Sequence, residues 1–136
     1  MSATGENGSS TKDYVLVTAA YNEEAFIEQP LRSVVSQTLL PLKWIIVSDG
    51  STDHTDEIVH GYAEKYRFIQ LHRITEDHPR NFAAQENASN TGFALLNGLE
   101  YEFVGNLDAD ISLEPGYFAQ LFEKFTQDPV LGLAGG

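Results

Sequence analysis

Two aspartates one residue apart, Asp108 and Asp110, give the sharpest chemical signal in the sequence. They follow the apolar run Phe103–Leu107, which reads as a buried strand. In an extended segment residues i and i+2 point the same way, so the two carboxylates repel each other unless one is protonated or a cation binds. Mg²⁺ and Mn²⁺ bind carboxylate and phosphate oxygens. The pair therefore predicts a metal site, with an acidic loop that caps the next helix as the alternative.

Two further polar turns follow apolar runs. Tyr21 and Glu23 come after the run Val15–Ala19, and a Gly-centred turn that begins Ser48-Asp49 comes after Trp44–Val47. A tyrosine ring can stack on another ring, and a carboxylate at the end of a buried strand can accept hydrogen bonds from a base imide or a ribose hydroxyl. Taken alone, each turn also fits an ordinary strand-to-helix connection with a polar cap.

The segments around these turns alternate between strand-like and helix-like patterns. Five short apolar runs are typical of strands in a parallel sheet, at residues 15–19, 44–47, 67–71, 103–107 and, more weakly, 130–134. Helical patterns occupy residues 26–35, 58–66, 83–98 and 118–125. This alternation predicts an α/β fold, a mostly parallel open sheet with helices on both faces. Ligands of such sheets bind beyond the carboxyl ends of the strands, where all three polar turns lie.

Several details of the helices are specific enough to be checked. Pro30 should kink the first helix or delay its start, and Asp53 is the expected N-cap of the second. Pro115 should occupy a first-turn position of the last helix. The small residues of segment 83–98 should permit a close approach of backbone or ligand. We interpret all four histidines as surface or loop residues.

The composition excludes several functions. The formal net charge is -12, from 20 acidic and 8 basic residues, and there is no cysteine. Disulfides, a thiolate nucleophile and a Cys-ligated zinc site are therefore excluded. The charge argues against nucleic-acid binding and against docking on an anionic membrane by charge alone. An anionic substrate would need a cation to attract it. The most basic stretch contains Arg73 and Arg80, and its loop Ile74–Asn81 could supply a phosphate contact or be an ordinary solvated loop.

The first residues differ in composition from the rest. Residues 1–12 are small and polar and lack the apolar core of a secretory signal, so we expect a flexible tail. No apolar run approaches the roughly 18 residues that a membrane span needs. Residues 13–136 are expected to form a single unit. These features favour a cytoplasmic location.

The three motifs, in this order, resemble family 2 glycosyltransferases with the glycosyltransferase A-type, Rossmann-like fold. The matching segments are VLVTAAYNEEAFIEQPLRSVVSQT, WIIVSDGSTDHTDEIV and FVGNLDADISLEPGYFAQLFEKF, and the resemblance covers residues 14–136. It implies transfer of a sugar, with inversion, from a nucleotide-diphosphate sugar to an acceptor hydroxyl on a glycan, lipid or protein. Polysaccharide biosynthesis is the setting that the resemblance implies.

The resemblance also implies roles for individual residues. Asp49 would contact the base, Asp108 would hold the ribose or the metal shell, and Asp110 would bind Mg²⁺ or Mn²⁺. The nucleotide pocket would further be lined by Ala20, Tyr21 and Glu23. Two departures stand out in the sequence. Ser48 replaces the first acidic residue of a D-D-G-S turn, and Ser89 stands where many members carry an Arg, whose contact would be missing or come from Arg80.

The length of the chain departs from the resemblance. In the family the catalytic base lies much further along the chain than the D-x-D pair. We therefore expect the base beyond Gly136, and we expect that none of the residues present serves as the base. The chain is then the N-terminal, donor-binding part of a larger enzyme, inactive alone. Such enzymes often act at the cytoplasmic face of a membrane, and the resemblance implies that location as an option for the full-length protein.

Two other functions stay open at this point. The segment LDADIS is similar to the motif of haloacid-dehalogenase-type phosphohydrolases, in which Asp108 would be the nucleophile and Asp110 the acid and base. That motif normally opens the first strand, however, and position 112 is Ser. A non-catalytic nucleotide-binding module is the second alternative.

Overall fold

The computed structural model describes residues 13–75, 79 and 82–127. Within these residues four strands form one all-parallel sheet in the order β4-β3-β2-β5. The strands are β2 (Tyr14–Ala20), β3 (Lys43–Asp49), β4 (Ile69–Ile74) and β5 (Phe103–Asn106). The parallel sheet confirms the expected fold class. The predicted tail at 1–12 and the predicted strand at 130–134 lie outside the described residues.

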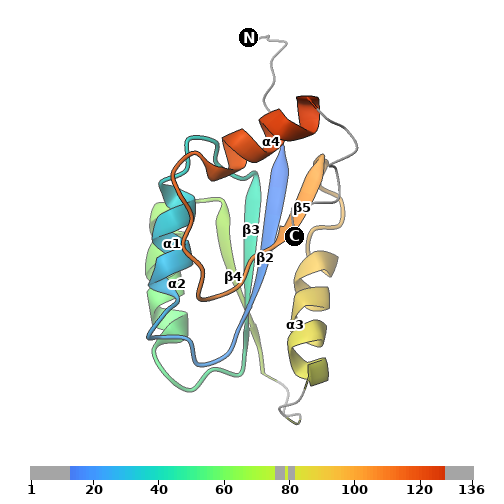
Figure 1. Cartoon of the computed structure of the whole chain (residues 1–136). Helices are drawn as coiled ribbons and strands as arrows, with labels where there is room; N and C mark the ends of the chain where they lie inside the picture. Colours follow the sequence, from blue (N-terminus) through green and yellow to red (C-terminus); the bar gives the residue numbers. More distant parts are fainter. Residues whose placement is uncertain (1–12, 76–78, 80–81, 128–136) are drawn as a thin grey trace.

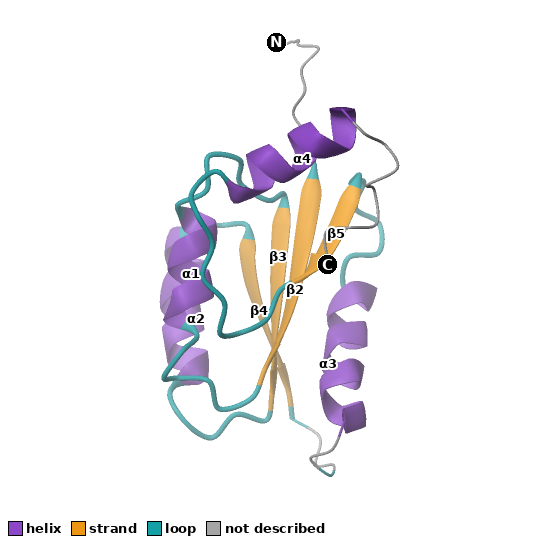
Figure 2. Ribbon diagram, viewed as in Figure 1, coloured by secondary structure: helices purple, strands orange, loops and turns teal. Residues whose placement is uncertain are grey.

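Helices cover both faces of this sheet. They are α1 (Glu28–Val35), α2 (Thr55–Lys65), α3 (Phe82–Ala94) and α4 (Tyr117–Gln127). Figures 1 and 2 show α1 and α2 on one side of the sheet and α3 on the other, with α4 across the end where the strands begin. The turns that follow the strands therefore meet at the opposite end, away from α4.

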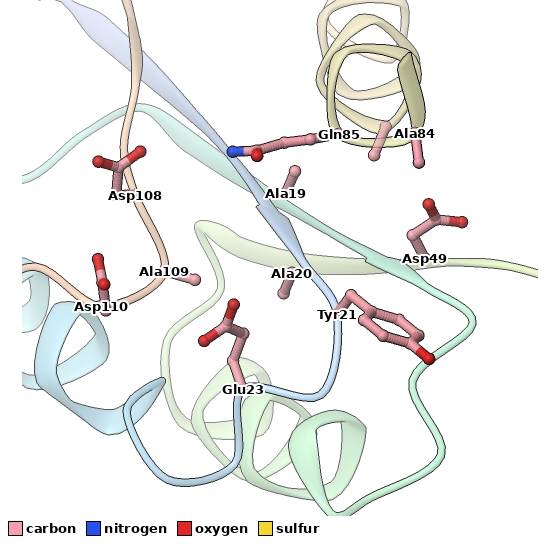
Figure 3. A pocket seen from close by; sticks show the side chains of 11 residues that line it. Ala19, Ala20, Tyr21, Glu23, Asp49, Ala84, Gln85, Asp108, Ala109 and Asp110 are labelled. Atoms are coloured by element: carbon pink, nitrogen blue, oxygen red, sulfur yellow. The ribbon is translucent and has the colours of Figure 1, made fainter. Parts of the chain in front are cut away.

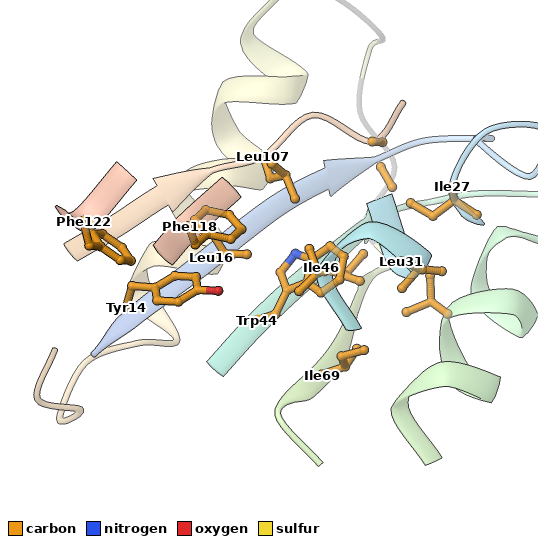
Figure 4. Packing of buried hydrophobic residues seen from close by; sticks show 14 residues of the cluster. Tyr14, Leu16, Ile27, Leu31, Trp44, Ile46, Ile69, Leu107, Phe118 and Phe122 are labelled. Atoms are coloured by element: carbon orange, nitrogen blue, oxygen red, sulfur yellow. The ribbon is translucent and has the colours of Figure 1, made fainter. Parts of the chain in front are cut away.

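The sheet is buried on both sides, which explains the uninterrupted apolar runs. On the α1 side, Leu16, Trp44 and Ile46 pack against side chains from α1 and α4 in the larger hydrophobic cluster (Figure 4). On the α3 side, Val17 and Val47 pack in a second cluster with residues of and just after α3. Alternate residues of β2 and β3 thus supply two cores.

Strand β4 differs from the expected run 67–71, because it begins at Ile69 and ends at Ile74. This strand lies at the edge of the described sheet, and only Ile69 of its six residues is fully buried. A half-buried edge strand needs fewer apolar residues, so the pattern misplaced its start. Its His72 lies within the strand and is partly buried, so the interpretation of all histidines as surface or loop residues is wrong there.

The helix starts follow the expectations in part. Pro30 is the third residue of α1, which begins late, so its missing N–H falls in the first turn, where N–H groups lack helical partners. Phe26, the first residue of the predicted helical pattern 26–35, precedes this helix and is 51% exposed, so that pattern begins too early. The N-cap of α2 is His54 and not Asp53, although the Asp53 carboxylate accepts the Thr55 N–H at 2.9 Å. Pro115 precedes α4 by two residues and is not in its first turn.

The expected close approach occurs at Gly92, where α3 lies against the sheet. A Cβ atom at this position would come within 2.5 Å of Val17 Cγ1 and 3.1 Å of Val47 Cγ2. Any larger residue must push the helix away from the two central strands. The missing side chain of Gly92 therefore sets how near α3 lies to β2 and β3.

Candidate functional site

A pocket of about 720 Å³ opens at the carboxyl ends of β2 and β3 and beside the segment after β5. The first turns of α3 close it from the side. Its lining is unusual in charge, because four of the eleven residues carry carboxylates. The lining residues are Ala19, Ala20, Tyr21, Glu23, Asp49, Ala84, Gln85, Ala88, Asp108, Ala109 and Asp110.

The polar side chains fall into two groups around this pocket. Figure 3 shows Glu23, Asp108 and Asp110 on one side and Tyr21 and Asp49 on the other. One end of the pocket is thus strongly acidic, and the other pairs an aromatic ring with a single carboxylate. A ligand that spans the pocket meets two different chemical environments.

The structure brings together residues that the sequence analysis selected from three separate turns. All of the predicted site residues except one line this single pocket, namely Ala20, Tyr21, Glu23, Asp49, Asp108 and Asp110. The exception, Arg80, lies outside the described residues, as does most of the loop between Ile74 and Asn81. Arg73, which precedes this loop, does not line the pocket, and its Nη1 lies 2.6 Å from Asp56 Oδ2. The chemical roles of the lining residues stay predictions.

The wall formed by α3 was not assigned to the site from the sequence. Ala84, Gln85 and Ala88 line the pocket, and Gln85 reaches from α3 over the pocket between the two polar groups (Figure 3). The run of small residues was the available signal, because it predicted a close approach of backbone or ligand. Nothing in the spacing singles out Gln85, whose position depends on how α3 packs.

Strand alternation explains why Asp49 lines the pocket and Ser48 does not. The two residues end β3, and consecutive strand residues point to opposite faces. Ser48 is fully buried on the α1 side, where its hydroxyl donates to Ser51 Oγ at 3.0 Å. Asp49 points to the α3 side and forms a buried part of the pocket wall. The departure from the D-D-G-S turn, in which Ser48 stands in place of the first acidic residue, thus concerns a side chain that does not line the pocket.

The segment after β5 alternates in the same way. Leu107 and Ala109 are buried, whereas Asp108 and Asp110 are exposed and line the pocket. The N–H of Leu107 donates to the carbonyl of Val17 at 2.8 Å, which extends the sheet pairing by one residue. The i, i+2 spacing therefore places both carboxylates at the pocket, as the sequence predicted.

Helix α1 holds the remainder of this segment in place. The N–H of Leu113 donates to Ser33 Oγ at 2.9 Å, and the amide of Gln37 donates to the carbonyl of Glu114 at 2.6 Å. The same buried amide accepts the N–H of Phe118 at 3.1 Å, near the start of α4. The loop that carries the two aspartates is thus fixed at its far end by buried or half-buried hydrogen bonds.

The pKa of Glu23, at the acidic end of the pocket, is raised above its ordinary value. Burial raises the pKa of this carboxyl, and the negative charges of Asp110 and Asp53 raise the pKa further. A raised pKa means that the ionised form is less stable in the folded protein than in the unfolded chain. The ionised carboxylate of Glu23 therefore costs stability in the folded protein.

We expect Glu23→Gln to raise the melting temperature at pH 7, because the variant buries no charge next to Asp110. The cost of the ionised carboxylate exists above the folded pKa and vanishes below the unfolded value of 4.5, where both states are protonated. Thermal unfolding at pH 7 and at pH 3 measures the difference, with exposed Glu86→Gln as control. A gain of equal size at both pH values would contradict the electrostatic explanation.

The donor set fits a hard divalent cation that shares its shell with a ligand. Among the described residues, no three acidic or histidine side chains come close enough to hold a metal ion by themselves. Mg²⁺ is commonly bound by one or two carboxylates together with phosphate oxygens and water, and not by an all-protein cage. Asp108 and Asp110 supply two carboxylates at the open acidic end of the pocket, which matches that pattern.

Comparison with known proteins agrees with this architecture. The sequence model of the Glycosyl transferase family 2 matches residues 15–136. Poly-beta-1,6-N-acetyl-D-glucosamine synthase from Staphylococcus epidermidis is 30% identical over 122 residues, which cover 87% of this chain and 26% of that protein. The chain thus spans about a quarter of the length of this relative.

Solved structures show the same fold. TarS from S. aureus, residues 1–349 in complex with UDP, superposes with a TM-score of 0.67 at 22% identity, over 85% of this chain and 32% of that TarS fragment. The mannosyltransferase PcManGT from Pyrobaculum calidifontis, in complex with GDP-Man and Mn²⁺, gives 0.56 at 26% identity over 75% of this chain and 28% of that one. The parallel sheet with a pocket at its carboxyl edge is that of the glycosyltransferase A-type fold. The chain belongs to glycosyltransferase family 2.

A membrane-spanning helix is not found among the described residues, where no helix is both long enough and apolar enough to cross a bilayer.

Proposed function

We propose that this chain is the donor-binding half of an inverting glycosyltransferase, which uses a nucleotide-diphosphate sugar and a divalent cation. The observation that carries the proposal is the convergence of Tyr21, Asp49, Asp108 and Asp110 on one pocket from three separate strand ends. Membership in glycosyltransferase family 2 supports the reaction class. Nucleotide sugars or nucleotides are named in the complexes of TarS and PcManGT, which share the fold.

The two ends of the pocket match the two ends of a nucleotide diphosphate. In the proposal, the Asp49 carboxylate accepts an N–H of the base, and the Tyr21 ring packs against the base or the ribose. The diphosphate lies at the other end, near Asp108 and Asp110. This orientation places the acceptor-only carboxylate where a base offers donors.

The acidic end would repel a diphosphate unless its charge were offset. One carboxylate that faces one phosphate charge at ~4 Å costs about 1 kcal/mol in water and about 4 kcal/mol at an effective dielectric constant near 20. Asp108 and Asp110 would hold Mg²⁺ or Mn²⁺ there. When bound, the cation would neutralise the negative charge of the leaving diphosphate as the sugar–phosphate bond breaks.

We assign substrate binding, but no proton transfer, to the described residues. The acceptor hydroxyl needs a base to remove its proton, and we propose that this base belongs to a longer protein that contains this unit. The relatives are three to four times longer than the matched region, which leaves room for an acceptor site. This chain alone would then bind a nucleotide without transferring a sugar.

Isothermal titration calorimetry with UDP, GDP and TDP tests the proposal. In the presence of Mn²⁺ at least one of the three should bind, and EDTA should weaken or remove that binding. Absence of binding by all three in Mn²⁺ would contradict the proposal, and equal binding in EDTA would contradict the role of the metal. Metal-dependent hydrolysis of p-nitrophenyl phosphate would favour the phosphohydrolase alternative.

A further inference from the structure

We propose that Asn22 is a positioning residue of the pocket, which fixes the loop after β2 (residues 21–24) to the loop after β3 (residues 50–54). Asn22 itself does not line the pocket. The name loop clasp is used below for the hydrogen bonds between residues 22–24 and residues 51–55. The proposal rests on the proposed function for the identity of the ligand, and on the hydrogen bonds of the loop clasp for the role of Asn22.

The backbone of Asn22 has an unusual conformation. Its φ angle is 51°, and among the described residues it is the only residue other than glycine with a positive φ. Asparagine tolerates this left-handed region better than most residues, because its short side chain can hydrogen-bond locally. The turn lies between Tyr21 and Glu23, both of which line the pocket. The conformation of Asn22 therefore directs both neighbours.

The polar groups of Asn22 explain how this turn is held. Its side-chain oxygen Oδ1 accepts the N–H of Thr52 at 2.7 Å and the N–H of Asp53 at 3.3 Å. Its own N–H donates to Ser51 Oγ at 3.0 Å. One residue of the first loop thus contacts three consecutive residues of the second, 29 to 31 positions further along the chain.

The following residues complete the loop clasp in both directions. The N–H of Glu23 donates to Thr55 Oγ1 at 2.8 Å, and the N–H of Glu24 donates to Asp53 Oδ2 at 3.2 Å. In return, the N–H of His54 donates to Glu24 Oε1 at 2.8 Å. Backbone donors of each loop are therefore satisfied by side chains of the other. The two loops thus form one unit, and the second loop begins directly after Asp49.

The position of Asn22 favours a role in ordering the pocket over a role in packing the core. The side chain of Asn22 is exposed, so its truncation opens no cavity among the buried residues. The loop clasp does, however, determine where Tyr21 and Glu23 stand relative to Asp49. A pocket whose walls are ordered before binding loses less conformational entropy when the ligand arrives. Loss of the loop clasp should therefore lower the affinity for the ligand more than it lowers the stability of the fold.

Three variants separate the backbone requirement from the hydrogen bonds. Asn22→Gly keeps the left-handed turn without strain but removes Oδ1. Asn22→Asp keeps an acceptor oxygen at this position and tolerates the same φ. Asn97→Gly makes the same exchange at an exposed residue after α3 that does not line the pocket. Each protein is compared with the unsubstituted chain by calorimetry in Mn²⁺ with whichever of UDP, GDP and TDP binds the unsubstituted chain, by thermal unfolding and by ¹⁵N relaxation without ligand.

We expect Asn22→Gly to raise the Kd for that nucleotide about five-fold, the size expected when a few loop residues must be ordered on binding. Relaxation should show increased motion of residues 51–53 in this variant, with β2 and β3 unchanged, whereas Asn22→Asp should keep these residues ordered. Asn97→Gly should change neither measurement. Unchanged motion of residues 51–53 in Asn22→Gly would overturn the loop clasp, as would an unchanged Kd.

The outcome also separates this inference from the proposed function. If the unsubstituted chain fails to bind any nucleotide, the proposed function fails, and the relaxation data without ligand still decide whether Asn22 orders the second loop. If the chain binds nucleotide and Asn22→Gly binds it equally well, only the positioning role fails.

Discussion

Replacement of Asp110 by Asn should raise the Kd in Mn²⁺ for the nucleotide that the chain binds (UDP, GDP or TDP) at least about ten-fold, which corresponds to about 1.4 kcal/mol. The variant keeps the shape of the side chain and removes one of the two carboxylates proposed to hold the cation. With the cation bound less tightly, the diphosphate meets the negative charges of Asp108 and Glu23 without compensation, since all three side chains line the same pocket. Calorimetry with and without Mn²⁺ measures the effect.

Glu86→Gln is the matched control for this experiment. Glu86 is exposed on α3 next to the lining residue Gln85, but it does not line the pocket. The control removes the same formal charge from the same region, so it reports the general electrostatic effect of the net charge. Equal Kd values for Asp110→Asn and the unsubstituted chain would exclude Asp110 as a metal ligand. Equal weakening by both variants would reduce its role to long-range repulsion.

Gly92→Ala should lower the free energy of unfolding by about 1–3 kcal/mol, the usual cost of overpacking a core. The added Cβ would come within 2.5 Å of Val17 Cγ1, and valine is stiff about χ1 and fully buried here. Because α3 must move outward, the wall formed by Ala84 and Ala88 should shift, and the affinity for the nucleotide should fall as well. Urea unfolding at 25 °C gives the change in stability.

The chain offers a matched control in a second helical glycine. At Gly61 in α2 an added Cβ would meet no atom within 4 Å. Gly61→Ala should therefore raise stability by roughly 0.5–1 kcal/mol, because alanine loses less backbone entropy in a helix. If Gly92→Ala proved as stable as Gly61→Ala, the close packing of α3 against β2 and β3 would be contradicted.

Much of the fold was predictable because its central strands are buried on both faces. The runs 15–19 and 44–47 lie within β2 and β3, whose residues are nearly all buried. The edge strand β4 was placed too early, because a strand with one buried residue out of six carries little apolar signal. The local pattern therefore works where burial is complete and fails at the edge of the sheet.

The lining of the site was predictable for a related reason. Residues that follow parallel strands meet at one edge of the sheet, so Tyr21, Asp49 and Asp110 could be expected to lie near one another. Gln85 could not be placed in the same way, because its position depends on the packing of α3 at Gly92. The site thus combines strand ends, which alternation predicts, with a helix, which only tertiary packing positions.

The loop clasp marks the clearest limit of the sequence. Asn22 lies in a turn that, from the sequence alone, fits an ordinary strand-to-helix connection with a polar cap. In the structure its contacts are with residues 29 to 31 positions further along the chain. No local pattern connects an asparagine with backbone N–H groups of a distant loop. Both loops have to be folded onto the same edge of the sheet before their hydrogen-bonding groups face each other.

The central claim is that a cation and a nucleotide bind together in the pocket at the carboxyl ends of β2, β3 and β5. Paramagnetic broadening of amide signals by Mn²⁺, in the presence of the one of UDP, GDP and TDP that binds, tests it most directly, because broadening depends steeply on distance from the ion. The account predicts that broadening centres on the segment 108–110 and on the neighbouring residues 20–23. Broadening centred on the exposed carboxylates of α2, around Glu57 and Glu64, would show that Mn²⁺ binds the acidic surface and would contradict the account.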